Sequence, residues 1–208
     1  MIYYVDNFLP QDEFEALATR VRKGFRGDTS SLVENSDEPL RVTHHDHSGD
    51  WEEGCNFIGQ ECRPAIKKMI ATMKDLGIKD LKNWSIWYQY IIDTMTVPVH
   101  RDSGLRKSDQ ANTYTAILYT SDWQEGWGGE FIVGEPVWGN GNMGKATSLK
   151  NLTHTIAPKP NRMMIGSRDE WHAVQKVTNS DPNYIRSFFA SGWSSIDVQQ
   201  AKGEFYDL

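Results

Sequence analysis

The pattern of apolar and polar positions predicts two helices in the first part of the chain. An apolar stripe from Phe14 to Val21 recurs every three to four residues and predicts a helix over about 10–23. A second stripe of the same period predicts a helix over about 55–76, in which Pro64 marks a kink or a restart. Each helix would bury one face and leave the other in water.

From Trp84 onward the pattern becomes strand-like, with short aromatic and β-branched runs between turns. Together with one N-terminal run, the predicted strands are 2–5, 84–92, one ending at His100, about 113–120, 130–133, 152–157, 162–166, 172–177 and 184–193. This order predicts a mainly β protein with N-terminal helices (α+β), a sandwich or jelly roll whose larger sheet is covered by helices on one face. Without a repeat or an obvious linker, we expect one domain over 1–208, with helical support over about 10–76 and a β core over about 84–194.

Two polar stretches interrupt this pattern and predict long loops. Residues 28–54 and 139–151 show no regular apolar spacing, and both contain glycine. Loops of this length inside a domain are usually functional or mobile. Both stretches are therefore candidates for a lid that closes over a substrate.

The composition argues against nucleic-acid and membrane partners. The formal net charge is −6 and the pI is about 5.5, whereas phosphate binding requires a basic surface. The N-terminus lacks the basic start and the apolar run of a signal peptide. No segment approaches the roughly 18 apolar residues that span a bilayer. We therefore expect a cytoplasmic protein, and the sequence does not indicate its oligomeric state.

The chain has two cysteines, Cys55 and Cys62. Seven residues apart on one predicted helix, they would lie about 10 Å from each other. That separation is too large for a disulfide, so we expect two reduced thiols, which fits a cytoplasmic protein.

The segment most suggestive of chemistry is Val97–Asp102, which follows an aromatic strand. In an extended chain His100 and Asp102 point to the same face. A distant histidine would complete a set of two imidazoles and one carboxylate. This set suits non-haem Fe(II) and leaves open positions on the metal. His172, about 70 residues downstream, is a candidate for the third ligand.

Other histidines compete for this role. His154 also follows the Val97–Asp102 segment. A separate cluster of His44, His45 and His47 could bind a metal by itself, but it lies in a polar stretch without a predicted strand to hold its side chains. A loop that faces the substrate is the alternative interpretation of that cluster.

Further motifs follow the His-x-Asp segment in a fixed order. They are Tyr119-Thr120-Ser121-Asp122-Trp123 with Gly128-Gly129-Glu130, then Pro158-Lys159-Pro160-Asn161-Arg162, then His172-Ala173-Val174, and finally Arg186 on the last strand. In this order and spacing the set resembles the prolyl-4-hydroxylase-like branch of the Fe(II)/2-oxoglutarate-dependent dioxygenases, over about residues 3–193. Each motif is short, but the ordered combination is specific. The resemblance implies a double-stranded β-helix (jelly roll) with iron at its mouth.

The resemblance also implies the roles of individual residues. His100, Asp102 and His172 match the metal ligands, and His172 has the His-x-Val context of the family. Arg186 matches the base that pairs with the distal carboxylate of 2-oxoglutarate, for which a planar guanidinium is well suited. It lies 14 residues after His172, several more than is usual in the family, and a longer hairpin loop at 178–182 would absorb the difference.

Two more residues match positions that line the cosubstrate pocket in related hydroxylases. Thr115 lies four residues before Tyr119 and should share its face of the strand. Tyr90 lies ten residues before His100. For Tyr90, packing in the core is an equal alternative, because the strand around it is rich in aromatic residues.

The implied reaction consumes 2-oxoglutarate and O₂ on Fe(II), with ascorbate as a possible accessory reductant, and hydroxylates an unactivated carbon. Asp102 favours hydroxylation, since the related halogenases have glycine or alanine there. Gly192 argues against a nucleobase substrate, because the nucleic-acid demethylases carry an arginine six residues after the 2-oxoglutarate arginine. A prolyl residue of a peptide or protein is the default substrate by analogy. The alternatives are a free amino acid or other small molecule, or a non-catalytic jelly-roll module that binds a ligand.

Overall fold

The computed structural model describes residues 1–27, 41–46, 49–78, 82–92, 96–102, 113–139, 146–179 and 184–194. The helices are α1 (Gln11–Gly27), α2 (Trp51–Ile58) and α3 (Arg63–Asp75), with a 3-10 turn at Gln60–Cys62. The strands are β1 (Ile2–Val5), β2 (Arg41–Asp46), β3 (Lys82–Ile92), β4 (Val97–His100), β5 (Thr113–Tyr119), β6 (Phe131–Trp138), β7 (Ala146–Ile156), β8 (Met163–Ser167), β9 (His172–Val174) and β10 (Ile185–Ser194).

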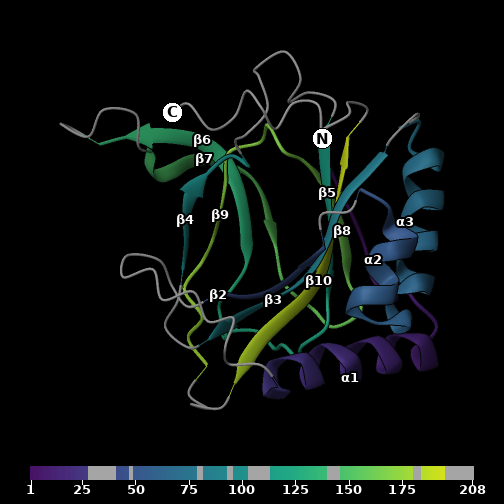
Figure 1. Cartoon of the computed structure of the whole chain (residues 1–208). Coiled ribbons are helices and arrows are strands. Elements are labelled where there is room, and N and C mark those ends of the chain that lie inside the picture. The colour runs from purple at the N-terminus through teal and green to yellow at the C-terminus, as the bar shows by residue number, and fades with distance from the viewer. Residues whose placement is uncertain are drawn as a thin grey trace, which may run out of the picture.

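The strands form two antiparallel sheets that face each other (Figure 1). The larger sheet has the strand order β1-β8-β5-β10-β3-β2, and the smaller sheet has the order β4-β9-β6-β7. Most neighbours in these sheets are distant in sequence, so the chain crosses repeatedly between the two sheets, as in a jelly roll. The predicted fold class, mainly β with N-terminal helices, is confirmed.

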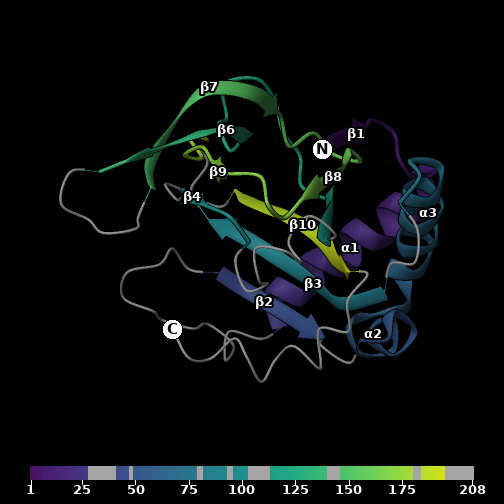
Figure 2. The same ribbon diagram turned by 90° about the horizontal axis from the view of Figure 1, so that it is seen from above.

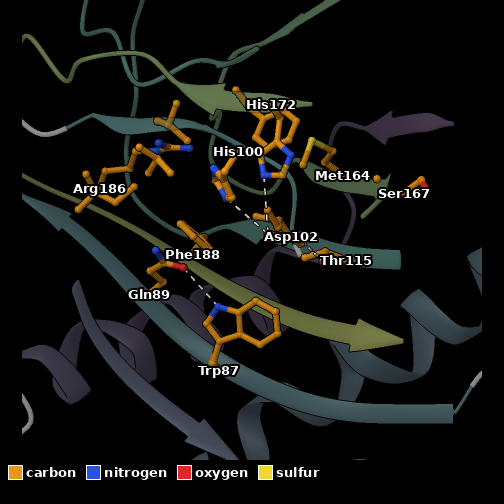
Figure 3. A pocket seen from close by; sticks show the side chains of 16 residues that line it. Trp87, Gln89, His100, Asp102, Thr115, Met164, Ser167, His172, Arg186 and Phe188 are labelled. Carbon is orange, nitrogen blue, oxygen red and sulfur yellow. Dashed lines mark hydrogen bonds and ion pairs between the residues drawn. The ribbon is translucent and has the colours of Figure 1, made fainter. Parts of the chain in front are cut away.

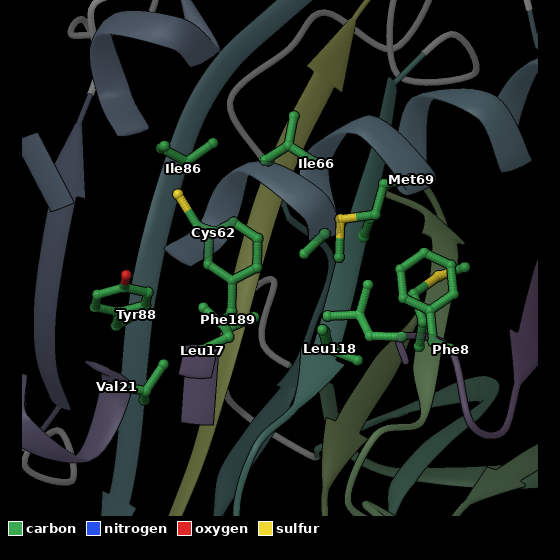
Figure 4. Close-up of a cluster of buried hydrophobic side chains, with 14 of the residues drawn as sticks. Phe8, Leu17, Val21, Cys62, Ile66, Met69, Ile86, Tyr88, Leu118 and Phe189 are labelled. Carbon is green, nitrogen blue, oxygen red and sulfur yellow. The ribbon is translucent and has the colours of Figure 1, made fainter. Parts of the chain in front are cut away.

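The three helices pack on one face of the larger sheet, and the smaller sheet lies on its other side (Figure 2). The contact between helices and sheet is a core of apolar side chains (Figure 4). Its fully buried members include Leu17, Val21, Ile66, Met69, Leu118 and Phe189. Within the residues that the structure describes, no helix is long and apolar enough to cross a membrane. The helices and this core hold the larger sheet in place on the face opposite the smaller sheet (Figure 2).

The helix predicted over 55–76 is interrupted, which corrects the expected separation of the cysteines. Gly59 has a φ of 134°, a conformation that favours glycine, and it ends α2. The chain restarts as α3 with Pro64 in its first turn, as the sequence predicts. This bend brings the Sγ atoms of Cys55 and Cys62 to 3.0 Å from each other. The predicted wide separation is wrong, although neither thiol forms a disulfide and both are buried.

The prediction that both stretches are loops throughout is wrong. All of β2 and the start of α2 lie inside 28–54, where β2 pairs with β3 at the edge of the larger sheet, and β7 begins inside 139–151. The lid predictions now rest on 28–40, 47–48 and 140–145, which lie outside the described residues. The side chains of the His44, His45 and His47 cluster lie outside them as well.

Candidate metal and cosubstrate site

A cavity lies between the sheets, on the face of the larger sheet that the helices do not cover (Figure 3). Its apolar lining includes Trp87, Ile91, Val97, Ile117, Phe131, Met164, Val174 and Phe188. Its polar and charged lining consists of Gln89, His100, Asp102, Thr115, Ser167, His172 and Arg186. A concave, mostly apolar site with a few convergent polar groups is the usual form of a ligand site.

Three of these residues converge so that they could hold one metal ion. His100 ends β4, Asp102 follows it, and His172 begins β9, where it pairs directly with His100. Asp102 Oδ1 lies 3.5 Å from His100 Nε2 and 3.8 Å from His172 Nε2. The ligand atoms of all three lie within 4.8 Å of one another. The fold thus brings together the set that the sequence predicts.

Both imidazole rings are held in the orientation that a metal requires. Nδ1 of His100 lies 2.8 Å from the carbonyl oxygen of Pro98, and Nδ1 of His172 lies 2.8 Å from that of Glu170. A carbonyl oxygen can only accept, so each Nδ1 carries the proton and each Nε2 keeps its lone pair for a metal. Burial lowers the pKa of His172, which favours the neutral ring that metals bind.

Asp102 is held in its ionised form. Burial by itself would raise the pKa of Asp102, but the neighbouring His100, His172 and Arg168 outweigh burial and hold the pKa well below its usual range. The Thr115 hydroxyl donates to Oδ2 of Asp102 over 3.2 Å, and Nε of Arg168 lies 3.6 Å from the same oxygen. Oδ1 is left to face the two imidazoles.

The donor set fits non-haem iron. Two imidazole nitrogens and one carboxylate oxygen on one side of a metal form the facial triad of Fe(II) oxygenases. The side of the triad that faces the cavity remains open to small molecules (Figure 3). The site can therefore bind a metal and a chelating cosubstrate together.

Arg186 supplies a buried positive charge beside this triad (Figure 3). Its side chain is 2% exposed, and its Nε and Nη1 atoms have no hydrogen-bond partner among the described residues. The guanidinium carbon lies 5.3 Å from the ring centre of Tyr119 and 5.9 Å from that of Phe188. Burial of a cation with two nitrogen atoms that lack hydrogen bonds is costly, so the geometry is suited to an anion that enters the cavity. Gly129 leaves space here, since a Cβ atom at this position would lie 3.2 Å from Arg186 Cδ.

The prediction that Tyr90 lines the cavity is wrong. Trp87, Gln89 and Ile91 of β3 face the cavity, and side chains alternate along a strand, so Tyr90 faces the other way. It is 1% exposed within the helix-covered core, and its hydroxyl donates to the carbonyl oxygen of Val21 over 2.5 Å. Packing in the core, the alternative for this residue, is what the structure shows.

Of the two remaining sequence candidates, one lies in the cavity and the other does not. Thr115 lines the cavity as predicted, whereas His154 lies on β7 outside the group that could hold a metal.

Sequence reasoning missed Gln89 and Arg168. Gln89 could have been found, because it is a single amide among aromatic and aliphatic residues on a strand. Arg168 carries no such signal, because its proximity to Asp102 depends on the turn between β8 and β9.

Solved structures share this fold at low sequence identity. A prolyl-4-hydroxylase from Pseudomonas putida is 18% identical, with a TM-score of 0.59 over 93% of this chain and 91% of that one. A Trichoplax adhaerens prolyl hydroxylase, in complex with a hypoxia inducible factor peptide fragment, is 15% identical, with a TM-score of 0.63 over 97% and 86% of the chains. HygX from Streptomyces hygroscopicus, with nickel, 2-oxoglutarate and hygromycin B bound, is 14% identical, with a TM-score of 0.64 over 93% and 82%. These likenesses confirm the double-stranded β-helix.

The sequence itself matches a known family. No curated protein matches the chain. The family model of the 2OG-Fe(II) oxygenase superfamily matches residues 87–194, which is more than half of the 208-residue chain and includes the whole cavity lining. The chain therefore belongs to the 2OG-Fe(II) oxygenase superfamily and is a 2-oxoglutarate-dependent dioxygenase.

Proposed function

We propose that this dioxygenase hydroxylates an unactivated carbon, with Fe(II) held by His100, Asp102 and His172. The convergence of the three ligand atoms within 4.8 Å is the observation that carries the proposal. Both Nε2 lone pairs and one carboxylate oxygen already face one another, because Nδ1 hydrogen bonds and the Thr115 hydroxyl occupy the other donor and acceptor atoms. Iron bound there would supply the reaction of O₂ with 2-oxoglutarate, which yields succinate and CO₂ and places one oxygen atom on the substrate.

Arg186 is the proposed anchor of the distal carboxylate of 2-oxoglutarate. Its Nε and Nη1 atoms are buried without a partner among the described residues, so they can donate to a carboxylate without first breaking a hydrogen bond. The positive charge of Arg186 also supports this role. Fe²⁺, the Asp102 carboxylate and the 2-oxoglutarate dianion together carry one negative charge, which Arg186 neutralises. Thr115 would act beside the cosubstrate by holding Asp102 in place.

A prolyl residue of a peptide or protein is the proposed substrate. Support comes from the similarity to two prolyl hydroxylases, one of them in complex with a peptide fragment. The similarity to HygX with bound hygromycin B favours a small molecule as the second candidate. At these identities the likeness concerns the fold, so the choice between the candidates rests on the lining of the cavity.

Succinate formation tests the proposed iron chemistry. The purified protein with Fe(II), 2-oxoglutarate and O₂ should release succinate, and release should stop when a chelator removes the metal. His100→Ala should reduce release to background, whereas His154→Ala should leave it unchanged, because His154 lies outside the ligand group. Equal activity of His100→Ala and the wild type would refute the proposed ligand set.

A further inference from the structure

The proposed iron and 2-oxoglutarate sites occupy most of the polar groups in the cavity. Three residues would bind the metal, Arg186 would bind a carboxylate, and the Thr115 hydroxyl already donates to Asp102. The Ser167 hydroxyl accepts the backbone N–H of Asp169 over 3.4 Å. Among the described lining residues, the O–H of Ser167 and the side-chain amide of Gln89 then remain without an assigned role, and Gln89 is the one whose orientation a printed contact fixes.

The orientation of the Gln89 amide is determined by its neighbour Trp87. The indole Nε1 of Trp87 lies 3.3 Å from Oε1 of Gln89, and both side chains line the cavity (Figure 3). An indole N–H can only donate, so the atom that faces it must be the amide oxygen. The Nε2 amino group is therefore directed away from Trp87, and it has no hydrogen-bond partner among the described residues. The Gln89 amide thus presents a neutral hydrogen-bond donor to the cavity in a fixed position.

The charges of the lining restrict what that donor can recognise. Among the described lining residues, Asp102 and Arg186 are the charged side chains apart from the histidines. With both used by iron and 2-oxoglutarate, neither the ammonium nor the carboxylate of a free amino acid would find an opposite charge in this lining. Burial of an unpaired charge costs far more than burial of a neutral amide that forms a hydrogen bond. The lining therefore favours an uncharged group.

We propose that Gln89, oriented by Trp87, is a specificity-determining residue that donates a hydrogen bond to a neutral carbonyl oxygen of the substrate. The inference rests on the proposed function and deepens it. It selects a residue inside a peptide, flanked by amide bonds, over a free zwitterionic amino acid. The indole ring beside Gln89 supplies an apolar wall against which a saturated ring can pack.

Two substitutions of Gln89 test whether its amino group acts as a hydrogen-bond donor to the substrate. Gln89→Glu keeps an oxygen that accepts from Trp87 and replaces the donor with a negatively charged acceptor. Gln89→Leu removes both interactions at similar volume. Gln175→Leu, the same change at an exposed position outside the cavity, is the matched control. Each variant is assayed for succinate release with a pool of N-acetylated, C-amidated prolyl tripeptides and, separately, with free L-proline.

The capped peptides should stimulate succinate release by the wild type, and free proline should not. Gln89→Glu and Gln89→Leu should raise the KM for the capped peptides by about tenfold or more, the effect of one lost hydrogen bond. In Gln89→Leu the KM for 2-oxoglutarate should stay as in the wild type. Gln175→Leu should behave as the wild type throughout.

Three results would overturn the inference. One is stimulation by free proline that equals stimulation by the capped peptides. Another is a rise in the KM for 2-oxoglutarate instead of the KM for the peptides, which would assign Gln89 to the cosubstrate. The third is that neither the capped peptides nor free proline stimulates succinate release, while metal-dependent release without substrate persists. This result would contradict the inference about Gln89 but not the proposed iron chemistry. Failure of the proposed function itself looks different, because no metal-dependent succinate would form under any condition.

Discussion

The two faces of strand β3 differ sharply although their residues alternate along one short segment. Tyr88 and Tyr90 are 1% exposed on the face covered by the helices, and their hydroxyls donate to backbone carbonyl oxygens. Trp87 and Gln89 are partly exposed on the other face and line the cavity. The same strand therefore contributes to stability through one set of side chains and to chemistry through the other.

The two faces also differ in whether their buried polar groups have hydrogen-bond partners. On the helix face the Tyr88 hydroxyl is satisfied by the Ile58 carbonyl oxygen at 3.1 Å. On the cavity face Arg186 keeps two buried nitrogen atoms without a partner among the described residues. A buried donor without a partner destabilises a protein, so its presence is better explained by ligand binding than by folding. The comparison predicts that substitutions on the two faces change different measured quantities.

Two neighbouring phenylalanines of β10 should show the largest difference in stability. Phe189 is 0% exposed in the helix-covered core, whereas Phe188 lines the cavity. Phe189→Ala should lower the free energy of unfolding by about 3–5 kcal/mol. Phe188→Ala should cost less, because part of its ring faces empty space and loses fewer contacts. Urea unfolding measures both, and equal losses would contradict the division into two faces.

Arg186→Met should affect binding and stability in opposite ways. The affinity for 2-oxoglutarate should fall by about 2–5 kcal/mol, as for loss of one partner of a buried charge pair. The stability of the metal-free protein should stay the same or rise, since the substitution removes a buried cation with two nitrogen atoms that lack a partner among the described residues. Arg162→Met is the control, because Arg162 is buried in an ion pair with Asp6 and should lose stability without loss of 2-oxoglutarate affinity. Calorimetric titration and thermal melts measure the two quantities, and an unchanged affinity in Arg186→Met would exclude its assigned role.

Thr115→Val should weaken metal binding while leaving the fold intact. The substitution keeps the shape of the side chain and removes the donor to Asp102 Oδ2. Loss of such a supporting hydrogen bond typically lowers metal affinity by about 10–100-fold. Thr153→Val, an exposed change on β7, should leave the affinity unchanged. Competition with a chelator of known affinity gives the comparison, and identical affinities for Thr115→Val and the wild type would remove Thr115 from the site.

Tyr90→Phe should have the smallest effect, and only on stability. Its hydroxyl donates to the Val21 carbonyl oxygen in the core, and such a bond is worth about 1 kcal/mol. The KM for 2-oxoglutarate should not change, because the side chain does not line the cavity. A raised KM with normal stability would instead support the role predicted from the sequence.

The sequence predicts the ligand triad better than it predicts the cavity wall. His100 and Asp102 are close in sequence on an extended segment, so their shared face follows from strand geometry, and ordered motifs single out His172. The face of Tyr90 could not be predicted, because apolar residues on both sides of β3 remove the alternation that encodes direction. In such a strand only the tertiary contacts decide which residues face the cavity.

Two further features were hidden for different physical reasons. β2 is a polar edge strand, so its sequence lacks the apolar alternation of a strand and gains its structure from pairing with β3. The contact between Cys55 and Cys62 depends on a single residue, Gly59, whose positive φ ends one helix before the next begins. A pattern of apolar spacing averages over many residues and misses such a local break.

Anaerobic titration calorimetry tests the central claim most directly, namely that His100, Asp102 and His172 hold one iron beside Arg186. Fe(II) should bind the wild type with one ion per chain, and 2-oxoglutarate should then bind tightly only to the iron-loaded protein. His172→Ala should lose the iron, and Arg186→Met should keep the iron but lose tight binding of 2-oxoglutarate. Undiminished iron binding by His172→Ala, or equal binding of 2-oxoglutarate by wild type and Arg186→Met, would contradict the account.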